Sequence, residues 1–278
     1  MTNAGVVPKP NEGAGDAPSS VAFVILSHTI NDFVLSRYRK LQGEIGRGYD
    51  VVLLLTKDLA ALAQELNIDD FEIVLEEDIF LAEYGEKGRS GKIVPGNTDL
   101  VMMAFARRRP RYDRIWMIEY DVAFPSGAGV LAEIDAASHA DLVLGRRWST
   151  RKQVPDWPWW KSLKPSNNDE ALVTLDTSRS GHFALSRYSR RLFDELEKAY
   201  RSGWAGHHEA TVPTIARIRE MPVEDINDIA RRSLGRVLLT PASFGATGCS
   251  PRSPDLIYHP IKDEAAEAAL LASLGLLT

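Results

Sequence analysis

Two carboxylates two residues apart, Glu119 and Asp121, carry the clearest chemical signal in the sequence. They follow residues 115–118, a short apolar run typical of a strand buried on both faces of a parallel sheet. Side chains two apart on an extended chain point the same way, so both carboxylates can converge on one cation while Tyr120 points away. The carboxyl ends of such strands are where open α/β sheets bind ligands. Simple solvation of both groups at the strand tip is the alternative.

The apolar strand followed by Glu-x-Asp resembles the acid-x-acid (DxD-type) motif of the GT-A class of nucleotide-sugar glycosyltransferases. In that class the motif follows a central strand and holds a divalent metal on the diphosphate of the sugar nucleotide. Here Glu119 occupies the first acidic position in place of Asp. The resemblance implies a single α/β domain with a GT-A-like (Rossmann-like), mostly parallel sheet flanked by helices. It also implies Mn²⁺ or Mg²⁺ as cofactor, with Glu119 and Asp121 among its ligands.

A second acidic group follows in residues 203–214, where two histidines and Glu209 stand at an expected helix start. In many inverting GT-A enzymes a carboxylate at such a position takes the proton from the acceptor hydroxyl. Glu209 resembles that base in type and in order along the chain. The alternative is a first-turn carboxylate stabilised by the helix dipole. We count His208 with the residues that bind acceptor or sugar, although a solvated or structural role is the simpler one.

Residues 258–262 resemble the His-x-x-Lys-like closing segment of several GT-A families. The resemblance implies that His259 completes the metal shell, where imidazole beside carboxylates suits Mn²⁺ or a related ion. It also implies that Lys262 meets the diphosphate and offsets the charge that develops on the leaving group. The alternative is a His-Pro pair in a loop without a ligand.

Aromatic rings gather in residues 148–168, which hold four of the six tryptophans among three prolines. Proline breaks regular structure, so these rings are predicted to lie on loops. Aromatic faces on a loop suit stacking against a sugar or a nucleobase. Trp157, Trp159 and Trp160 are therefore predicted to bind acceptor or sugar. A small core packed beneath the loop is the alternative.

Alternating strands and helices must position these side chains. Strands are predicted at residues 21–26, 50–56, 71–75, 115–118, 140–145 and 179–185, helices near 32–45, 58–66, 98–109, 129–137, 189–202 and 264–277, and loops or turns at 85–91 and 180–182. The carboxyl ends of parallel strands share one edge of the sheet. Ser27 and His28 after the first strand, with Asn97 at a helix start, are therefore predicted to line the nucleotide pocket.

Length and composition indicate one sizeable domain, because the chain has 278 residues of which 44% are hydrophobic. Residues 1–20 have almost no large apolar side chains and are predicted to be a disordered tail. The domain is expected at 21–278, with a nucleotide-binding half at 21–145, an acceptor-side half at 146–262 and a C-terminal helix at 263–278.

Charge and missing motifs argue against several functions. The net charge of −5 gives no general basic signature for nucleic acid or anionic membranes, and the arginines at 107–111 are predicted to form a solvated helix end. Neither an apolar run of membrane-spanning length nor a signal-peptide pattern is present, and the single cysteine, Cys249, fits a reducing, cytoplasmic location. Without GxGxxG or GxxxxGK[ST] loops, a Rossmann dehydrogenase and a P-loop kinase are disfavoured.

The sequence therefore predicts a metal-dependent, hexosyltransferase-type glycosyltransferase, with inversion favoured through Glu209 alone. Its expected partners are a nucleotide-sugar donor, a UDP-sugar being favoured, and a glycan or small-molecule acceptor. Two alternatives stay open. One is a phosphoester or nucleotide-sugar hydrolase in which the same metal ligands activate water. The other is a non-catalytic carbohydrate-binding protein that uses the tryptophan loop.

Overall fold

The computed structural model describes residues 20–89, 91–239 and 253–277, without the side chains of residues 146–148. The predicted N-terminal tail, apart from Ser20, and Cys249 lie outside the described residues.

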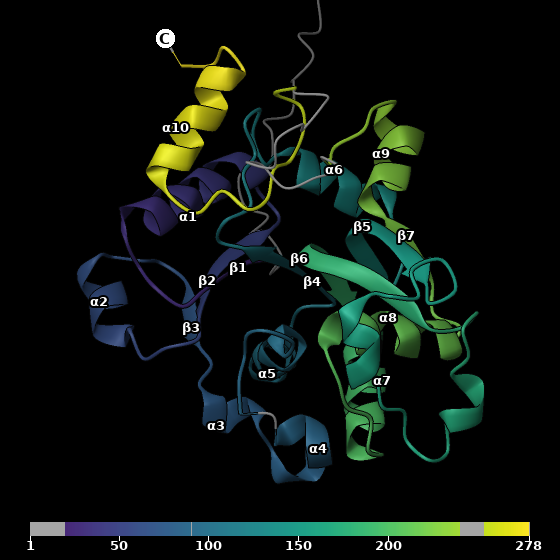
Figure 1. The fold of residues 1–278 in the computed structure, drawn as a ribbon. Helices are drawn as coiled ribbons and strands as arrows, with labels where there is room; N and C mark the ends of the chain where they lie inside the picture. The colour runs from purple at the N-terminus through teal and green to yellow at the C-terminus, as the bar shows by residue number, and fades with distance from the viewer. Residues whose placement is uncertain (1–19, 90, 240–252, 278) are drawn as a thin grey trace, which may run out of the picture.

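A seven-stranded sheet with the order β3-β2-β1-β4-β6-β5-β7 forms the centre of the molecule (Figure 1). Its strands are β1 (Val21–Ser27), β2 (Asp50–Leu55), β3 (Phe71–Ile73), β4 (Arg114–Glu119), β5 (Leu142–Thr150), β6 (Arg179–Ser189) and β7 (Val223–Asp225). β1 pairs in parallel with β2 and β4, β2 with β3, and β5 with β7, whereas β6 runs antiparallel to both β4 and β5. The predicted mostly parallel α/β sheet in a single domain is confirmed.

Helices cover both faces of the sheet because its central strands are apolar on both sides, as in β1, where every residue is buried. On one face α1 (Asp32–Ile45), α6 (Val130–Ala137) and α9 (Ile226–Leu234) share a core with the strands. On the other face α5 (Thr98–Arg108), α7 (Arg190–Arg201) and α8 (His208–Ile218) do the same (Figure 1). This three-layer packing leaves the carboxyl ends of the parallel strands at an open edge.

The remaining elements are short: α2 (Ala60–Glu65), α3 (Glu76–Ile79), η1 (Ala82–Tyr84), α4 (Gly85–Gly88), η2 (Pro158–Ser162), η3 (Glu170–Leu172) and α10 (Glu264–Ser273). The loop predicted at 85–91 thus begins with a helical turn, and the turn predicted at 180–182 is wrong because those residues continue β6. β7 and α9 were not predicted. Among the described residues no helix is long and apolar enough to cross a membrane.

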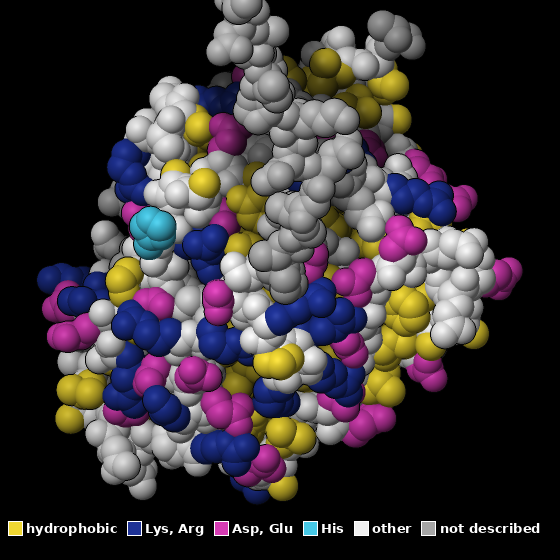
Figure 2. Space-filling model, turned by 180° about the vertical axis from the view of Figure 1, so that it is seen from behind, with side chains coloured by type: hydrophobic (Ala, Val, Ile, Leu, Met, Phe, Trp, Pro, Cys, Tyr) yellow, Lys and Arg dark blue, Asp and Glu magenta, His cyan; other side chains and the backbone are white. Residues whose placement is uncertain are grey.

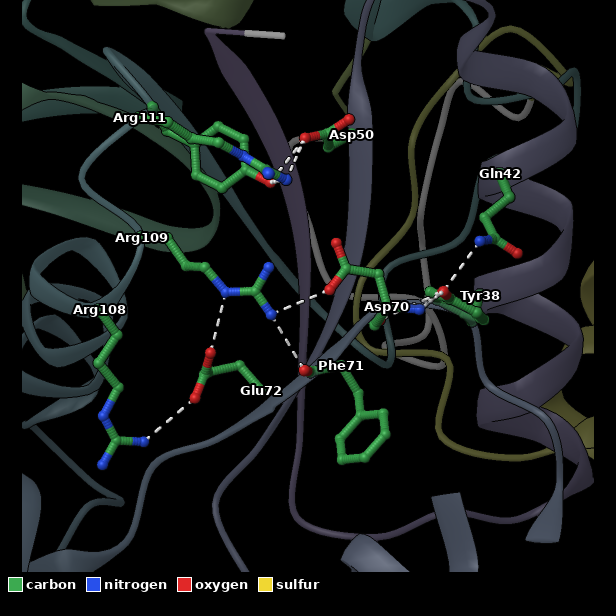
Figure 3. Close-up of polar contacts among 10 residues, drawn as sticks. Tyr38, Gln42, Asp50, Asp70, Phe71, Glu72, Arg108, Arg109 and Arg111 are labelled. Atoms are coloured by element: carbon green, nitrogen blue, oxygen red, sulfur yellow. Dashed lines mark hydrogen bonds and ion pairs between the residues drawn. The ribbon is translucent and has the colours of Figure 1, made fainter. Parts of the chain in front are cut away.

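The arginine-rich end of α5 is neutralised by carboxylates from the neighbouring strands rather than simply solvated (Figure 3). Arg109 pairs with Asp70 at 3.0 Å and with Glu72 at 2.9 Å, and Arg111 pairs with Asp50 at 2.7 Å. Figure 2 likewise shows Lys and Arg mixed with Asp and Glu over the face seen from behind.

Candidate metal and nucleotide site

The carboxyl end of β4 is held by a segment from the far end of the chain. Glu119 is the last residue of β4, and Asp121 lies in the turn that follows. Tyr258 exchanges two backbone hydrogen bonds with Ala123, just after this turn: the Ala123 amide donates at 2.8 Å and the Tyr258 amide at 3.0 Å. The Ile261 amide donates to the Asp121 carbonyl at 2.7 Å. This pairing carries the intervening His259 to the two carboxylates.

The three side chains form a compact cluster. His259 Nε2 lies 3.2 Å from Glu119 Oε2 and 3.2 Å from Asp121 Oδ1. One candidate ligand atom from each residue lies within 4.8 Å of the other two. Carboxylate oxygens with an imidazole nitrogen are a donor set that suits Mn²⁺, and the carboxylates also suit Mg²⁺. The residues therefore fit a divalent cation.

The electrostatics of the cluster also indicate a missing positive charge. Burial opposes the charged form of His259, but the hydrogen bonds and charges of Asp121 and Glu119 outweigh it and raise its pKa to about 9. The imidazolium thus balances only part of the acidic charge. Asp121 Oδ1 is buried, and His259 Nε2 lies 3.2 Å from it. A metal ion would satisfy this oxygen and take the place of the imidazolium proton.

The cluster opens into a cleft of about 360 Å³, within the size range of small-molecule sites. The cleft brings together six of the residues predicted for metal or nucleotide binding: Ser27, His28, Glu119, Asp121, His259 and Lys262. Lys262 is exposed and makes no ion pair with any described residue. Its ammonium is therefore available to an anion bound in the cleft.

The predicted nucleotide-pocket residues differ in what their side chains offer. His28 is exposed and contacts Tyr120 edge to face, with ring centroids 5.5 Å apart. The Ser27 hydroxyl is used within its own turn, where it donates to the Thr29 carbonyl at 2.8 Å. Asn97 is 5% exposed, donates to the Lys92 carbonyl and is not among the residues that line the cleft, so the structure does not bring it together with the other predicted residues. Folding of the preceding loop onto α5 buries it.

Glu209 stands in the first turn of α8, with a side chain that is only 19% exposed. Burial raises the pKa of Glu209 to about 7, and the charge of Glu119 adds to the rise. A hydrogen bond from the Phe183 amide and the charge of His259 act in the opposite direction. A carboxylate stabilised mainly by a helix dipole would have a lowered pKa. Glu209 is instead a buried carboxylate that is electrostatically coupled to Glu119 and His259.

The two histidines before Glu209 are structural in this fold. His207 caps α8 by accepting the Glu209 amide on Nδ1 at 3.3 Å. His208 is 6% exposed, and its Nε2 lies 3.1 Å from the Thr98 hydroxyl. Burial lowers the pKa of His208 well below its usual value, so it is neutral. The ring that was predicted to contact acceptor or sugar thus joins α8 to α5 inside the core.

The tryptophan loop lies against the start of α8. Trp159 is half-buried and stacks on His207, with centroids 4.1 Å apart and ring planes at 11°. Trp157 is also half-buried and meets Trp160 edge to face at 4.9 Å. Trp160 is 3% exposed and donates from Nε1 to the Val154 carbonyl at 2.7 Å. Trp160, which was predicted to bind acceptor or sugar, thus packs beneath the loop, as the alternative stated for this loop describes.

His182 was predicted to belong to a structural turn, with contact between that turn and an acceptor as the alternative. It lies on β6, and its ring centroid is 5.2 Å from that of His259, with the planes at 64°. The position of His182 near His259 depends on the antiparallel pairing of β6 with β4, which no local sequence pattern predicts. Tyr120, Thr56 and Thr98 also line the cleft without having been predicted.

Comparisons with known proteins found no matching family model and no similar curated protein sequence. Three solved structures are similar in fold. A protein described as a glucose-1-phosphate thymidylyltransferase of Bacillus anthracis, in complex with sucrose, has a TM-score of 0.40 and 9% identity over 74% of this chain and 85% of that one. The 4-diphosphocytidyl-2C-methyl-D-erythritol synthase of Anaerococcus prevotii has a TM-score of 0.41 and 11% identity over 74% and 88%. The mannosyltransferase PcManGT of Pyrobaculum calidifontis, with GDP-mannose and Mn²⁺, has a TM-score of 0.38 and 15% identity over 77% of this chain and 58% of that one.

Proposed function

We propose that this protein is a metal-dependent glycosyltransferase that moves a sugar from a nucleoside-diphosphate sugar to an acceptor hydroxyl with inversion. One observation carries the proposal: an acid-acid-histidine cluster opens into a cleft beside an exposed lysine. Glu209, a buried carboxylate of raised pKa, is electrostatically coupled to Glu119 and His259 of this cluster. Mn²⁺ or Mg²⁺ held by Glu119, Asp121 and His259 would neutralise charge on the donor diphosphate.

The chain's own residues supply the remaining steps. Lys262 binds the diphosphate and stabilises the negative charge that grows as it leaves. Glu209 takes the proton of the acceptor hydroxyl while the acceptor oxygen bonds to the anomeric carbon and the bond to the diphosphate breaks. A base works best when its pKa is near the working pH, which a value of about 7 provides. Trp159, beside the residue that caps α8, is placed to stack against the acceptor.

The test is release of nucleoside diphosphate from a panel of nucleotide sugars, with Mn²⁺, with Mg²⁺ and with a chelator. Wild type is compared with Asp121→Asn and Glu209→Gln, and the exposed Glu264→Gln on α10 serves as the matched control. We expect metal-dependent release that Asp121→Asn abolishes and that Glu209→Gln lowers by about 10²–10⁴. Inversion predicts a product of opposite anomeric configuration, read by NMR.

Two results would contradict the proposal. Metal-dependent cleavage that never transfers to any acceptor in a broad panel would favour a hydrolase. Glycan binding indifferent to chelator, without any turnover, would favour a binding protein.

A further inference from the structure

Arg37 on α1 is a buried cation that the proposed mechanism does not use. Its side chain is 10% exposed, and its guanidinium lies over the ring of Phe33, 4.4 Å from the centroid. Burial lowers the pKa of Arg37, while the charges of Glu267 and Asp121 act in the opposite direction. Arginine stays charged in folded proteins, so a permanent positive charge lies near one of the candidate metal ligands.

The guanidinium contacts both chain segments that supply the candidate metal ligands. Its Nη1 donates a hydrogen bond to the carbonyl of Val122, the residue after Asp121. Its Nη2 lies 3.5 Å from Glu267 Oε1 on α10, the helix that follows His259 in the chain (Figure 1). Arg37 therefore joins two parts of the site that are far apart in the sequence.

Apolar packing beside Arg37 links the same segments. Phe33 belongs to a small buried cluster that also contains Ala123, just after the turn that carries Asp121. The other buried members come from the C-terminal segment: Leu256, Tyr258, Ile261 and Leu270. The attraction between a guanidinium and an aromatic face restrains the Arg37 side chain on this cluster.

Direct binding of a substrate does not explain Arg37. It is not among the residues that line the cleft. The cavity beside it has a volume of about 40 Å³ and lies between α1, the end of β4 and Glu267. This volume has room for about one or two water molecules and is far below the size of a substrate site. A positive charge near a cation site also weakens cation binding through space, so charge alone gives no reason for an arginine here.

We infer that Arg37 is a positioning residue for the metal site, an inference that rests on the proposed function. Its hydrogen bond to the Val122 carbonyl fixes the turn that carries Asp121. Its ion pair with Glu267 holds the segment that carries His259 against the same helix. Ligands from two segments can bind one ion only when both segments keep a fixed relative position, which the groups behind the ligands provide.

The sign of the change in Mn²⁺ affinity separates positioning from a through-space effect of charge. Calorimetry gives the Mn²⁺ affinity of the full chain for wild type, Arg37→Met, Arg37→Lys and Glu267→Gln. Methionine keeps an unbranched side chain over Phe33 without the charge and the hydrogen bond, whereas lysine keeps the charge and one donor group. Arg39→Met, at an exposed position of the same helix, is the matched control. Circular dichroism verifies folding.

We expect Arg37→Met to weaken Mn²⁺ binding about tenfold or more, as loss of a group behind metal ligands does. The electron paramagnetic resonance spectrum of the bound ion should broaden, because the ligands then adopt several arrangements. Arg37→Lys should retain part of the affinity, Glu267→Gln should weaken binding by a smaller factor than Arg37→Met, and Arg39→Met should match wild type.

Unchanged or tighter Mn²⁺ binding in folded Arg37→Met would overturn the inference alone, because removal of a merely repulsive charge strengthens cation binding. Should Arg37→Met fail to fold, wild-type Mn²⁺ affinity in both Arg37→Lys and Glu267→Gln would overturn it. A wild type that binds no Mn²⁺ would overturn the proposed function as well. Mn²⁺ binding that follows the expected pattern without any sugar transfer would leave the positioning role standing and overturn the proposed function.

Discussion

Two acidic sites flank the same strand and are built in opposite ways. Asp135 is fully buried and is met by Arg187 at 2.8 Å, Arg114 at 2.9 Å and the Trp116 indole N–H at 3.1 Å. Two guanidinium groups therefore surround one carboxylate. Arginine stays charged at every pH that a folded protein meets, so this compensation is permanent.

The cluster at the other end of β4 has the opposite balance of charged groups. Here two carboxylates, those of Glu119 and Asp121, lie beside one imidazole, that of His259. Histidine gives up its proton in an accessible pH range, and the cluster lies in a cleft. The difference teaches where to look for function: Asp135 has two arginines against it inside the fold, whereas the Glu119–Asp121 pair is the one for which we propose a cation from solution.

The largest expected effect comes from removing one carboxylate of the cleft pair. Asp121→Asn should lower metal-dependent turnover by about a thousandfold, because the metal's stabilisation of leaving-group charge contributes several kcal/mol. Nucleoside diphosphate release measures this, with circular dichroism to verify folding. Turnover within tenfold of wild type would contradict the proposed difference between Asp121, as a metal ligand, and Asp135, as a structural carboxylate.

The same substitution at the structural site should act on stability instead. Asp135→Asn leaves Arg187 buried without its counter-charge, and we expect the free energy of unfolding to fall by about 3–5 kcal/mol. Urea denaturation gives the change, and Mn²⁺ titration of the folded variant should match wild type. A stable variant that had lost Mn²⁺ binding would reverse the assignment of the two sites.

Glu209 is a third acidic residue. It is buried and forms no ion pair with a lysine or arginine among the described residues. Its folded pKa of about 7 exceeds the ordinary value of 4.5, so the native state binds the extra proton and loses stability as pH rises from about 4.5 through 7. Glu209→Gln should therefore match wild type near pH 4.5 and gain up to about 3 kcal/mol above pH 7. Denaturation measurements across this pH range test the prediction. A gain in the free energy of unfolding that is independent of pH would show that ionisation of the buried carboxylate is not the cause of the gain.

Metal itself should stabilise the fold by an amount that depends on the cleft pair. Mn²⁺ at a hundredfold excess over its Kd should raise the free energy of unfolding by about 2.7 kcal/mol, and a chelator should remove the gain. Asp135→Asn should keep this increment on its lower baseline, whereas Asp121→Asn should lose it. Equal increments in both variants would place the ion elsewhere.

Local patterns were enough to predict the elements that are buried on both faces. β1 and β4 are continuous apolar runs. The side chains of Glu119 and Asp121 converge because they are two residues apart on an extended chain. His259 was assigned through a resemblance, because nothing near it in the sequence indicates that its segment pairs with the turn after β4.

The sequence does not show which of the predicted side chains face solvent, because tertiary packing decides this. Asn97, Trp160 and His208 have the chemistry of binding residues, yet loop and helix docking buries each of them. β7 has only three residues and forms by pairing with β5, so its own sequence carries little signal. His182 on β6 meets His259 of the C-terminal segment, which is again a long-range contact.

The most direct test is Mn²⁺ binding followed by electron paramagnetic resonance, with wild type beside Asp121→Asn and Asp135→Asn. The structure predicts saturable Mn²⁺ binding in wild type, its loss in Asp121→Asn and its retention in folded Asp135→Asn. A wild type that binds no Mn²⁺, or binding that survives in Asp121→Asn, would contradict the assignment of Glu119, Asp121 and His259 as a metal site.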